Sequence, residues 1–229
     1  MKVLIVYAHP EPRSFNGAMK DLAVEVLSGA GHQVQVSDLY AMNFPPAGGP
    51  GDFVTQENPD FFGYQREQMH ATSGGLFDPA LKAEMDKLVW ADMVIFQFPL
   101  WWFSLPAILK GWVDRVFAMG FAYGLQQSYE SGVFRGKRSM LAFTTGGPAR
   151  VYQPGGRNGG MDELILHIQR GMLYFVGMEV LPPFIAYGAS RCTPEERAAY
   201  LEAYRQRLLT LDSTVPIYST AVGSGSESR

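Results

Sequence analysis

Residues 2–16 read KVLIVYAHPEPRSFN, and this stretch sets the expectations for the whole fold. Its first half, Lys2–Ala8, is an apolar, β-branched run typical of a buried strand. The run ends at His9, and Ser14 then opens a helical pattern over Phe15–Ser28, in which apolar residues recur at spacings of three and four. A buried strand, a short loop and an amphipathic helix form the opening unit of an alternating α/β protein.

The same alternation continues along the chain. The expected strands are Gln33–Leu39, Met93–Pro99, Ser139–Thr144 and Glu179–Tyr187, and the expected helices are Pro79–Trp90, Pro106–Met119, Met161–Val176 and Pro194–Leu211. The second strand alternates in polarity like an edge strand, whereas the third is apolar throughout like a central one. We therefore predict an α/β fold with a doubly wound, five-stranded parallel sheet of order 2-1-3-4-5. This is the flavodoxin-like arrangement, with helices on both faces.

The 229 residues are expected to form one domain, 1–220, followed by a flexible, Ser/Gly-rich tail at 221–229. Residues 41–78 lack hydrophobic periodicity and carry Pro45, Pro46 and several aromatic residues, which predicts a long irregular loop. A structureless stretch of this length inside a compact domain is usually functional.

The composition excludes several classes of protein. A net charge of −3 argues against a nucleic-acid-binding surface, and no apolar run is long enough to span a membrane. The single cysteine, Cys192, excludes an internal disulfide and favours a reducing, cytoplasmic location. Only 18% of residues are charged while 13% are aromatic, which indicates apolar surface covered by a second subunit or a flat ligand.

Ligands of such sheets bind beyond the carboxyl ends of the strands, where four places are candidates: three short loops and whatever part of the long loop at 41–78 reaches them. The first, HPEPRSFN at 9–16, opens a helix, so its amides, Arg13 and Ser14 favour an anion. Alternatively, Ser14 has only a structural role as the N-cap of the helix. The second loop carries Trp101, Trp102 and Phe103, which suit stacking on a planar ring. A core or subunit-interface cluster is the alternative, and only the position of this loop at the switch point favours the ligand.

The third loop is TTGGPARVYQPGGRNGG at 144–160. Gly146 and Gly147 let the backbone approach a ligand closely, and their amides can meet developing negative charge. A merely flexible connection is the alternative. Tyr152 and Asn158 are the side chains of this loop best suited to hydrogen bonding with a ring system. No G-x-G-x-x-G follows the first strand, which weighs against a Rossmann-type nicotinamide site.

Four motifs resemble a known family when they are taken together. AHPEPRSFNGAMK (8–20), FQFPLWWFSLPAILKGWVDRVF (96–117), GFAYG (120–124) and TTGGPARVYQPGGRNGG (144–160) resemble the flavin-dependent NAD(P)H:quinone oxidoreductases, the DT-diaphorase family. The resemblance extends from about Lys2 to Ile217. It implies a flavodoxin-like homodimer that binds two FAD molecules at its interface. NAD(P)H or a related dihydronicotinamide gives a hydride to flavin N5 and leaves, and a quinone then takes both electrons, a ping-pong cycle.

The resemblance also implies roles for individual residues. Contacts to FAD would come from His9, Ser14, Phe15, Asn16, Pro99, Leu100, Trp102, Phe103, Thr144, Thr145, Gly146, Gly147 and Tyr152. The substrate pocket would be formed by Trp102, Phe103, Tyr123, Leu125, Asn158 and Phe175, some of them from the opposite subunit. Tyr152, Gly146, Gly147 and Asn158 would serve catalysis by stabilising negative charge on the reduced flavin.

Several positions depart from the best-known members. Asn158 stands where they have a histidine, and an asparagine cannot take up a proton near neutral pH, so a histidine relay does not carry over. The subfamily that prefers dihydronicotinamide riboside also has asparagine there, but its metal-ligand positions are Arg170, Tyr174 and Ser219 here, so no metal is expected. Leu125 replaces a pocket tyrosine, and Gly63 stands where the family has a glutamine near the adenine. The preferred nicotinamide donor is therefore left open.

Three other functions are compatible with these residues: a flavoprotein azo- or nitroreductase, an FMN-binding electron carrier, and an FAD-binding protein that senses redox state. The sequence His9-Pro10-Glu11-Pro12 disfavours the carrier, which would have a Ser/Thr-rich phosphate loop.

Overall fold

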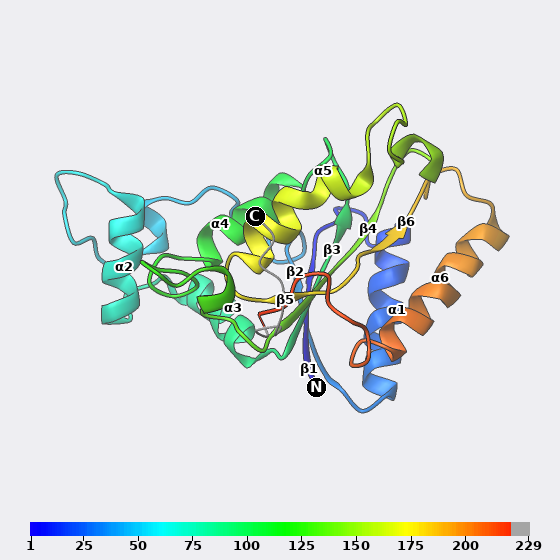
Figure 1. Ribbon diagram of the computed structural model, residues 1–229. Helices are drawn as coiled ribbons and strands as arrows, with labels where there is room; N and C mark the ends of the chain where they lie inside the picture. Colours follow the sequence, from blue (N-terminus) through cyan, green and yellow to red (C-terminus); the bar gives the residue numbers. More distant parts are fainter. Residues whose placement is uncertain (221–229) are drawn as a thin grey trace.

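The computed structural model describes residues 1–220, so the tail predicted at 221–229 lies outside the described residues. The strands are β1 (Lys2–Tyr7), β2 (Gln33–Asp38), β3 (Met93–Pro99), β4 (Arg138–Thr144), β5 (Glu179–Val180) and β6 (Phe184–Ala186). The α-helices are α1 (Phe15–Gly29), α2 (Tyr64–Gly74), α3 (Pro79–Trp90), α4 (Ala107–Val116), α5 (Met161–Ile168) and α6 (Pro194–Leu209). Figure 1 shows them in sequence colours.

The sheet confirms the predicted order. Its strands follow the order β2-β1-β3-β4-β5, and every pairing is parallel. The single fifth strand predicted over Glu179–Tyr187 is wrong, because two short strands occupy it: β5 pairs with the start of β4 and β6 with its end. Pro182 and Pro183 lie between them, and a proline has no amide hydrogen to continue a ladder.

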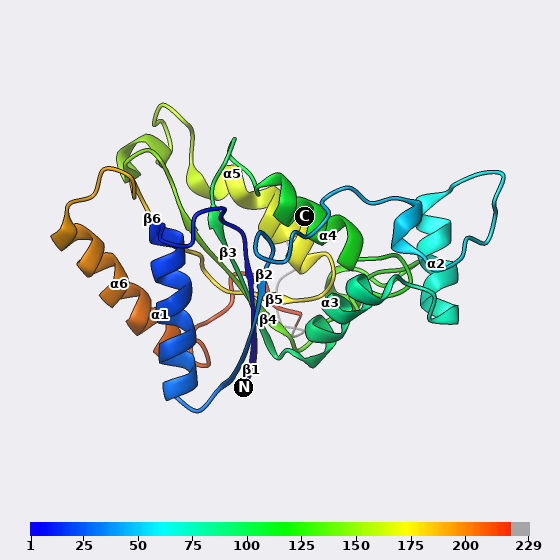
Figure 2. The same cartoon turned by 180° about the vertical axis from the view of Figure 1, so that it is seen from behind.

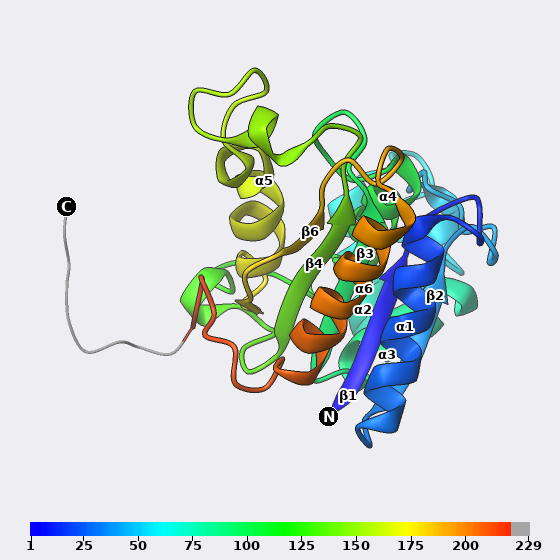
Figure 3. The ribbon, with the colours of Figure 1, turned by 90° about the vertical axis from the view of Figure 1, so that its right-hand side faces the viewer.

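Helices cover both faces of the sheet, as predicted. Figures 1 and 2 show α1 and α6 on one face, and α3, α4 and α5 on the other. Met19 of α1 and Tyr204 of α6 are fully buried in the first layer, as are Leu88 of α3 and Trp112 of α4 in the second. The loops that follow β1, β3 and β4 gather at one end of the sheet, opposite the N-terminus (Figure 3). The candidate loops are therefore neighbours in space.

Some predicted boundaries are wrong. The irregular stretch predicted at 41–78 contains the helix α2, which buries only Glu67, Gln68 and Ala71 and so lacks an apolar stripe that the sequence could reveal. The helix predicted over Met161–Val176 ends as an α-helix at Ile168 and continues as a π-helical segment, Gln169–Tyr174. Within residues 1–220, no helix combines the length and apolar content that crossing a lipid bilayer requires.

A buried ion pair anchors this long loop to α4. Arg115 donates from Nη2 and Nε to Asp52 Oδ1 at 2.7 and 2.9 Å, and both side chains are almost fully buried. Tyr64 at the start of α2 donates its hydroxyl to the other Asp52 oxygen at 2.5 Å. Arg115 also donates to the backbone oxygen of Pro45 at 2.6 Å, so its guanidinium holds Pro45 and Asp52 directly and Tyr64 through Asp52.

Candidate functional site

A cavity of about 470 Å³ opens where the carboxyl ends of β1, β3 and β4 meet. It is lined by His9, Arg13, Ser14, Phe15, Asn16, Pro99, Leu100, Trp101, Thr144, Thr145, Gly146, Ala189, Ser190 and Arg197. We call it the switch-point pocket, because it lies between β1 and β3, where the strand order reverses. The pocket brings together nine of the thirteen residues predicted to contact the cofactor; Trp102, Phe103, Gly147 and Tyr152 are outside its lining.

The loop between β1 and α1 presents a helix N-terminus to this pocket. Ser14 is the N-cap of α1, and its Oγ accepts a hydrogen bond from Gly17 N at 3.1 Å. A Cβ at Gly17 would lie 1.9 Å from the backbone oxygen of Pro12, so only glycine lets the loop fold this closely onto the helix. The first turn of α1 carries no acidic residue, which leaves its positive end free to attract an anion.

Asn16 joins the helix to the floor of the pocket. Its Nδ2 donates to Thr144 Oγ1 at 2.9 Å, and its backbone oxygen accepts from Gln97 Nε2 at 2.6 Å. Tyr204 of α6 in turn donates to Gln97 Oε1 at 3.2 Å. Asn16 Oδ1 is buried and has no hydrogen-bond partner within residues 1–220. A buried acceptor without a partner is costly, so this atom is suited to receive a hydrogen bond from a ligand.

The charges of the pocket favour an anionic ligand. Arg13 forms an exposed ion pair with Glu11, with Nε 3.0 Å from Oε1, whereas the exposed side chain of Arg197 has no partner among residues 1–220. Burial lowers the pKa of His9, so this imidazole is neutral near pH 7. Its Nδ1 lies 3.0 Å from Glu11 N, which holds the ring in place within the loop.

The aromatic loop after β3 is a tight turn. Trp101 N and Ser104 O are 3.1 Å apart, and the two residues between them, Trp102 and Phe103, have φ values of 50° and 58°. Left-handed backbone at two successive aromatic residues is strained, since their Cβ atoms crowd the backbone there. The turn directs Trp101 to the pocket and leaves Trp102 95% exposed. The cofactor roles predicted for Trp102 and Phe103 stay predictions, and Trp101 is the tryptophan at the wall.

The glycine loop after β4 supplies a cluster of hydrogen-bond donors. The amides of Gly146 and Gly147 have no acceptor within residues 1–220, and neither does the Tyr152 hydroxyl. A Cβ at Gly147 would lie 3.3 Å from that hydroxyl, so the tyrosine packs directly on the glycine backbone. Asn158 N donates to Val151 O at 2.9 Å, which keeps Asn158 beside the same turn. We call these residues the donor cluster.

The predicted substrate residues lie elsewhere. Tyr123 and Phe175 are together, with ring centroids 5.7 Å apart, in a hollow of about 190 Å³ that shares no residue with the switch-point pocket. Gln65 of α2 donates to the Tyr123 hydroxyl at 3.0 Å. Leu125 is 86% exposed. Within one chain these three residues are not part of the pocket at the switch point.

The positions compared above with a metal site make other contacts. The Tyr174 hydroxyl donates a hydrogen bond to Glu130 at 2.6 Å. Burial, and to a smaller extent this hydrogen bond, raises the pKa of Tyr174 to about 12. The Arg170 guanidinium lies 5.1 Å from the centre of the Tyr129 ring. Within residues 1–220, no three His, Cys, Asp or Glu side chains are grouped as metal ligands.

Sequence reasoning missed part of the wall on the α6 side. Ala189, Ser190 and Arg197 line the switch-point pocket but belong to the last third of the chain. Thr193 and Glu196 form a capping box at the start of α6, and that pattern indicates a helix start without indicating a ligand. Tyr187 was also missed; its ring centroid lies 5.8 Å from that of Tyr152.

The sheet order and the pocket at the switch point define a flavodoxin-like α/β protein, and a family model described as the flavodoxin-like fold matches residues 1–210. Over 221 residues the chain is 46% identical to ribosyldihydronicotinamide dehydrogenase (quinone) of Homo sapiens, with 96% of each protein covered. It is 43% identical over 218 residues to NAD(P)H dehydrogenase (quinone) 1 of Rattus norvegicus, covering 95% of this chain and 80% of that protein. A candidate quinone reductase from Klebsiella pneumoniae superposes with a TM-score of 0.91 at 47% identity, covering 95% of this chain and 87% of the other. The chain belongs to the NAD(P)H:quinone oxidoreductase family.

Proposed function

We propose that this chain is an FAD-dependent quinone reductase that takes a hydride from NAD(P)H or a related dihydronicotinamide and passes both electrons to a quinone. The single observation that carries the proposal is the make-up of the switch-point pocket. It combines a helix N-terminus and two arginines with Asn16 Oδ1, a buried acceptor that has no partner among residues 1–220. The helix N-terminus and the arginines suit phosphate, and Asn16 Oδ1 suits a hydroxyl group of a ribityl or ribose chain. When bound, the flavin would supply hydride transfer at N5.

The length of the pocket favours FAD over FMN. The N-terminus of α1 suffices for the single phosphate of FMN, but the pocket continues beyond it to Ser190 and Arg197 at the α6 side. A diphosphate linked to adenosine would use this second positive group, and the shorter cofactor would leave it unpaired. Trp101 and Leu100 of the same lining would present apolar surface to a flat ring.

The donor cluster would supply the electrostatic part of catalysis. The amides of Gly146 and Gly147 and the hydroxyl of Tyr152, which have no acceptor in the described part of the chain, can stabilise negative charge without rearranging. The packing of Tyr152 on Gly147 already positions them. Asn158 would add a hydrogen bond but no proton transfer. If the hydride donor and the quinone occupy the same place in turn, the kinetics are ping-pong.

A homodimer would complete the site. Tyr123, Leu125 and Phe175 lie outside the switch-point pocket of their own chain, so a substrate role for them requires the pocket of a second copy. Trp102 and Leu125, which are 95% and 86% exposed, are large apolar side chains that such a contact would cover. Light scattering at micromolar concentration is expected to give twice the chain mass, and a monomer that still reduces quinones would contradict this assembly.

Cofactor identification and turnover test the activity. The purified protein is expected to be yellow and to release FAD, identified by chromatography after heat denaturation. It should oxidise NADH or a dihydronicotinamide faster with a quinone than in a control without quinone. A colourless protein that takes up no added FAD, or the release of FMN alone, would contradict the cofactor; equal rates with and without quinone would contradict the activity.

A further inference from the structure

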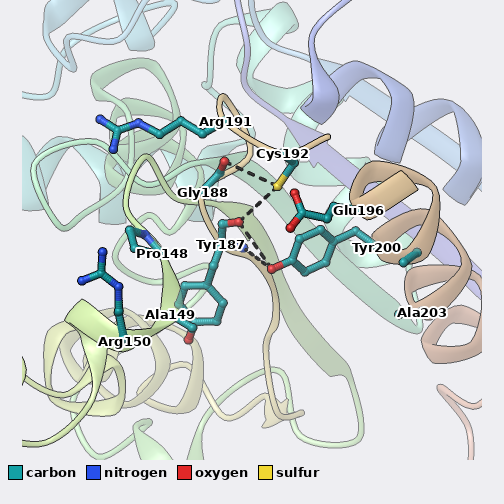
Figure 4. A pocket seen from close by; sticks show the side chains of 11 residues that line it. Pro148, Ala149, Arg150, Tyr187, Gly188, Arg191, Cys192, Glu196, Tyr200 and Ala203 are labelled. Carbon is teal, nitrogen blue, oxygen red and sulfur yellow. Dashed lines mark hydrogen bonds between the residues drawn. The ribbon is translucent and has the colours of Figure 1, made fainter. Parts of the chain in front are cut away.

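A second and larger hollow, of about 690 Å³, lies beside the switch-point pocket (Figure 4). Its walls come from 148–150 after β4, 187–192 after β6, and α6. We call it the arginine pocket, after Arg150 and Arg191. The two hollows are lined by neighbouring residues of the same segments: Gly146 and Ser190 line the first, and Pro148 and Arg191 line the second. A ligand that crosses the glycine loop can therefore contact both.

The charges of the arginine pocket are unbalanced. The exposed side chains of Arg150 and Arg191 have no hydrogen-bond or ion-pair partner among residues 1–220, and their guanidinium groups lie on the same side of the pocket in Figure 4. Glu196 is the one acidic residue of the lining, and its carboxylate already accepts from Thr193 N at 2.8 Å. Burial raises the pKa of both the Tyr187 hydroxyl and the Cys192 thiol, so these groups stay neutral.

The remaining surface suits a planar ring. Tyr187 and Tyr200 contribute aromatic surface, and the Tyr200 hydroxyl is engaged with the backbone of Tyr187 at 3.2 and 3.4 Å. Pro148 and Ala203 add apolar surface. The Tyr187 ring packs against Tyr152 of the donor cluster, so the arginine pocket directly adjoins the place proposed for hydride transfer.

We propose that the arginine pocket binds the adenosine phosphate end of a dinucleotide hydride donor, and that this chain therefore prefers NADPH or NADH over dihydronicotinamide riboside. This inference rests on the proposed function. The dihydronicotinamide ring lies at the donor cluster, the phosphates meet Arg150 and Arg191, and the adenine lies against the tyrosine side. The riboside carries no phosphate and gains nothing from the two arginines. Guanidinium groups are well matched to phosphate oxygens.

Neutral substitutions of the two arginines test the inference in the flavin-loaded protein. Arg150→Gln and Arg191→Gln are each expected to raise KM for NADPH about tenfold with little change in kcat. A tenfold rise in KM is the effect expected when one charge-assisted contact to the substrate is lost. Kinetics with dihydronicotinamide riboside should stay unchanged. Arg135→Gln is the matched control, because Arg135 is exposed in the loop that precedes β4, at the opposite end of the sheet. Adenosine 2′,5′-bisphosphate should compete with NADPH in the native protein and lose affinity in the double variant.

Either of two kinetic results would overturn the inference: a change in KM for NADPH of less than twofold in the double variant, or an equal change for the riboside. Failure of the proposed function looks different, because then no donor reduces the flavin in any variant. Calorimetric titration with adenosine 2′,5′-bisphosphate separates the two failures. It measures the arginine pocket without turnover, and equal affinity in the native protein and the double variant would also reject the inference.

Discussion

Replacing Asp52 with alanine is expected to destabilise the protein strongly, although Asp52 lies in the stretch predicted as an irregular loop. The substitution removes the acceptor of two Arg115 contacts at 2.7 and 2.9 Å and of the Tyr64 hydroxyl at 2.5 Å. Arg115 stays buried and, among the residues that the structure describes, retains as partners the Pro45 oxygen and the Phe44 ring, 4.8 Å away. Breaking a buried pair from one side costs about 3–5 kcal/mol, a large part of the roughly 5–15 kcal/mol that holds a typical domain folded.

Urea unfolding followed by circular dichroism, with matched flavin content, measures this loss. Asp114→Ala is the control: its partner Lys110 is exposed, so less than about 0.5 kcal/mol should be lost. Adding Arg115→Met to Asp52→Ala should recover about 2 kcal/mol, because it removes the unpaired buried charge. A loss below about 1 kcal/mol for Asp52→Ala, or independent effects of the two substitutions, would refute the argument that this ion pair anchors the loop.

Three further changes test the site. Gly17→Ala should abolish flavin binding and lower Tm, because the added Cβ lies 1.9 Å from Pro12 O, while Gly29→Ala, with open space around it, should leave both unchanged. Tyr152→Phe should slow flavin reduction about tenfold in stopped-flow measurements without altering unfolding, because its hydroxyl has no partner within residues 1–220 to lose. Burial lowers the pKa of His9 in the folded protein. The contribution of His9 to stability should therefore be complete above its unfolded-state pKa of about 6.5 and be lost as the pH falls below that value. The His9→Gln substitution should flatten this dependence of Tm on pH.

The strands and their order could be predicted because burial on both faces leaves a local signal. Met93–Pro99 is apolar in six of its seven positions, and all seven are buried. The helix α2 left no such signal, since it lies at the rim, where a polar surface suffices. The break between β5 and β6 was foreseeable from Pro182 and Pro183, because two adjacent prolines cannot continue a parallel ladder.

The switch-point pocket was predictable wherever it follows from topology. The start of α1, which carries Asn16, and the end of β4, which carries Thr144, had to meet once the strand order was known, and the structure joins the two side chains by a hydrogen bond of 2.9 Å. Arg197 was not predictable in this way. Its place at the pocket depends on how α6 packs against α1, a tertiary contact that leaves no pattern around the residue itself.

The turn after β3 places Trp101 in the lining of the switch-point pocket, whereas the cofactor role of Trp102 stays a prediction. Two successive aromatic residues with φ near 50–58° each cost about 1–2 kcal/mol, and a local reading of the sequence would not choose that conformation. Ser104 sustains the turn through backbone bonds to Trp101 and a 3.0 Å side-chain contact to His167 Nε2 of α5. The left-handed backbone of this turn points the neighbouring rings in different directions: Trp101 lines the switch-point pocket of its own chain, and Trp102 projects into solvent. In the proposed homodimer, this short segment would therefore form part of the cofactor pocket through Trp101 and part of the subunit contact through Trp102. The second subunit would cover Trp102, which is why a chain with only 18% charged residues can expose so large an apolar side chain as a monomer.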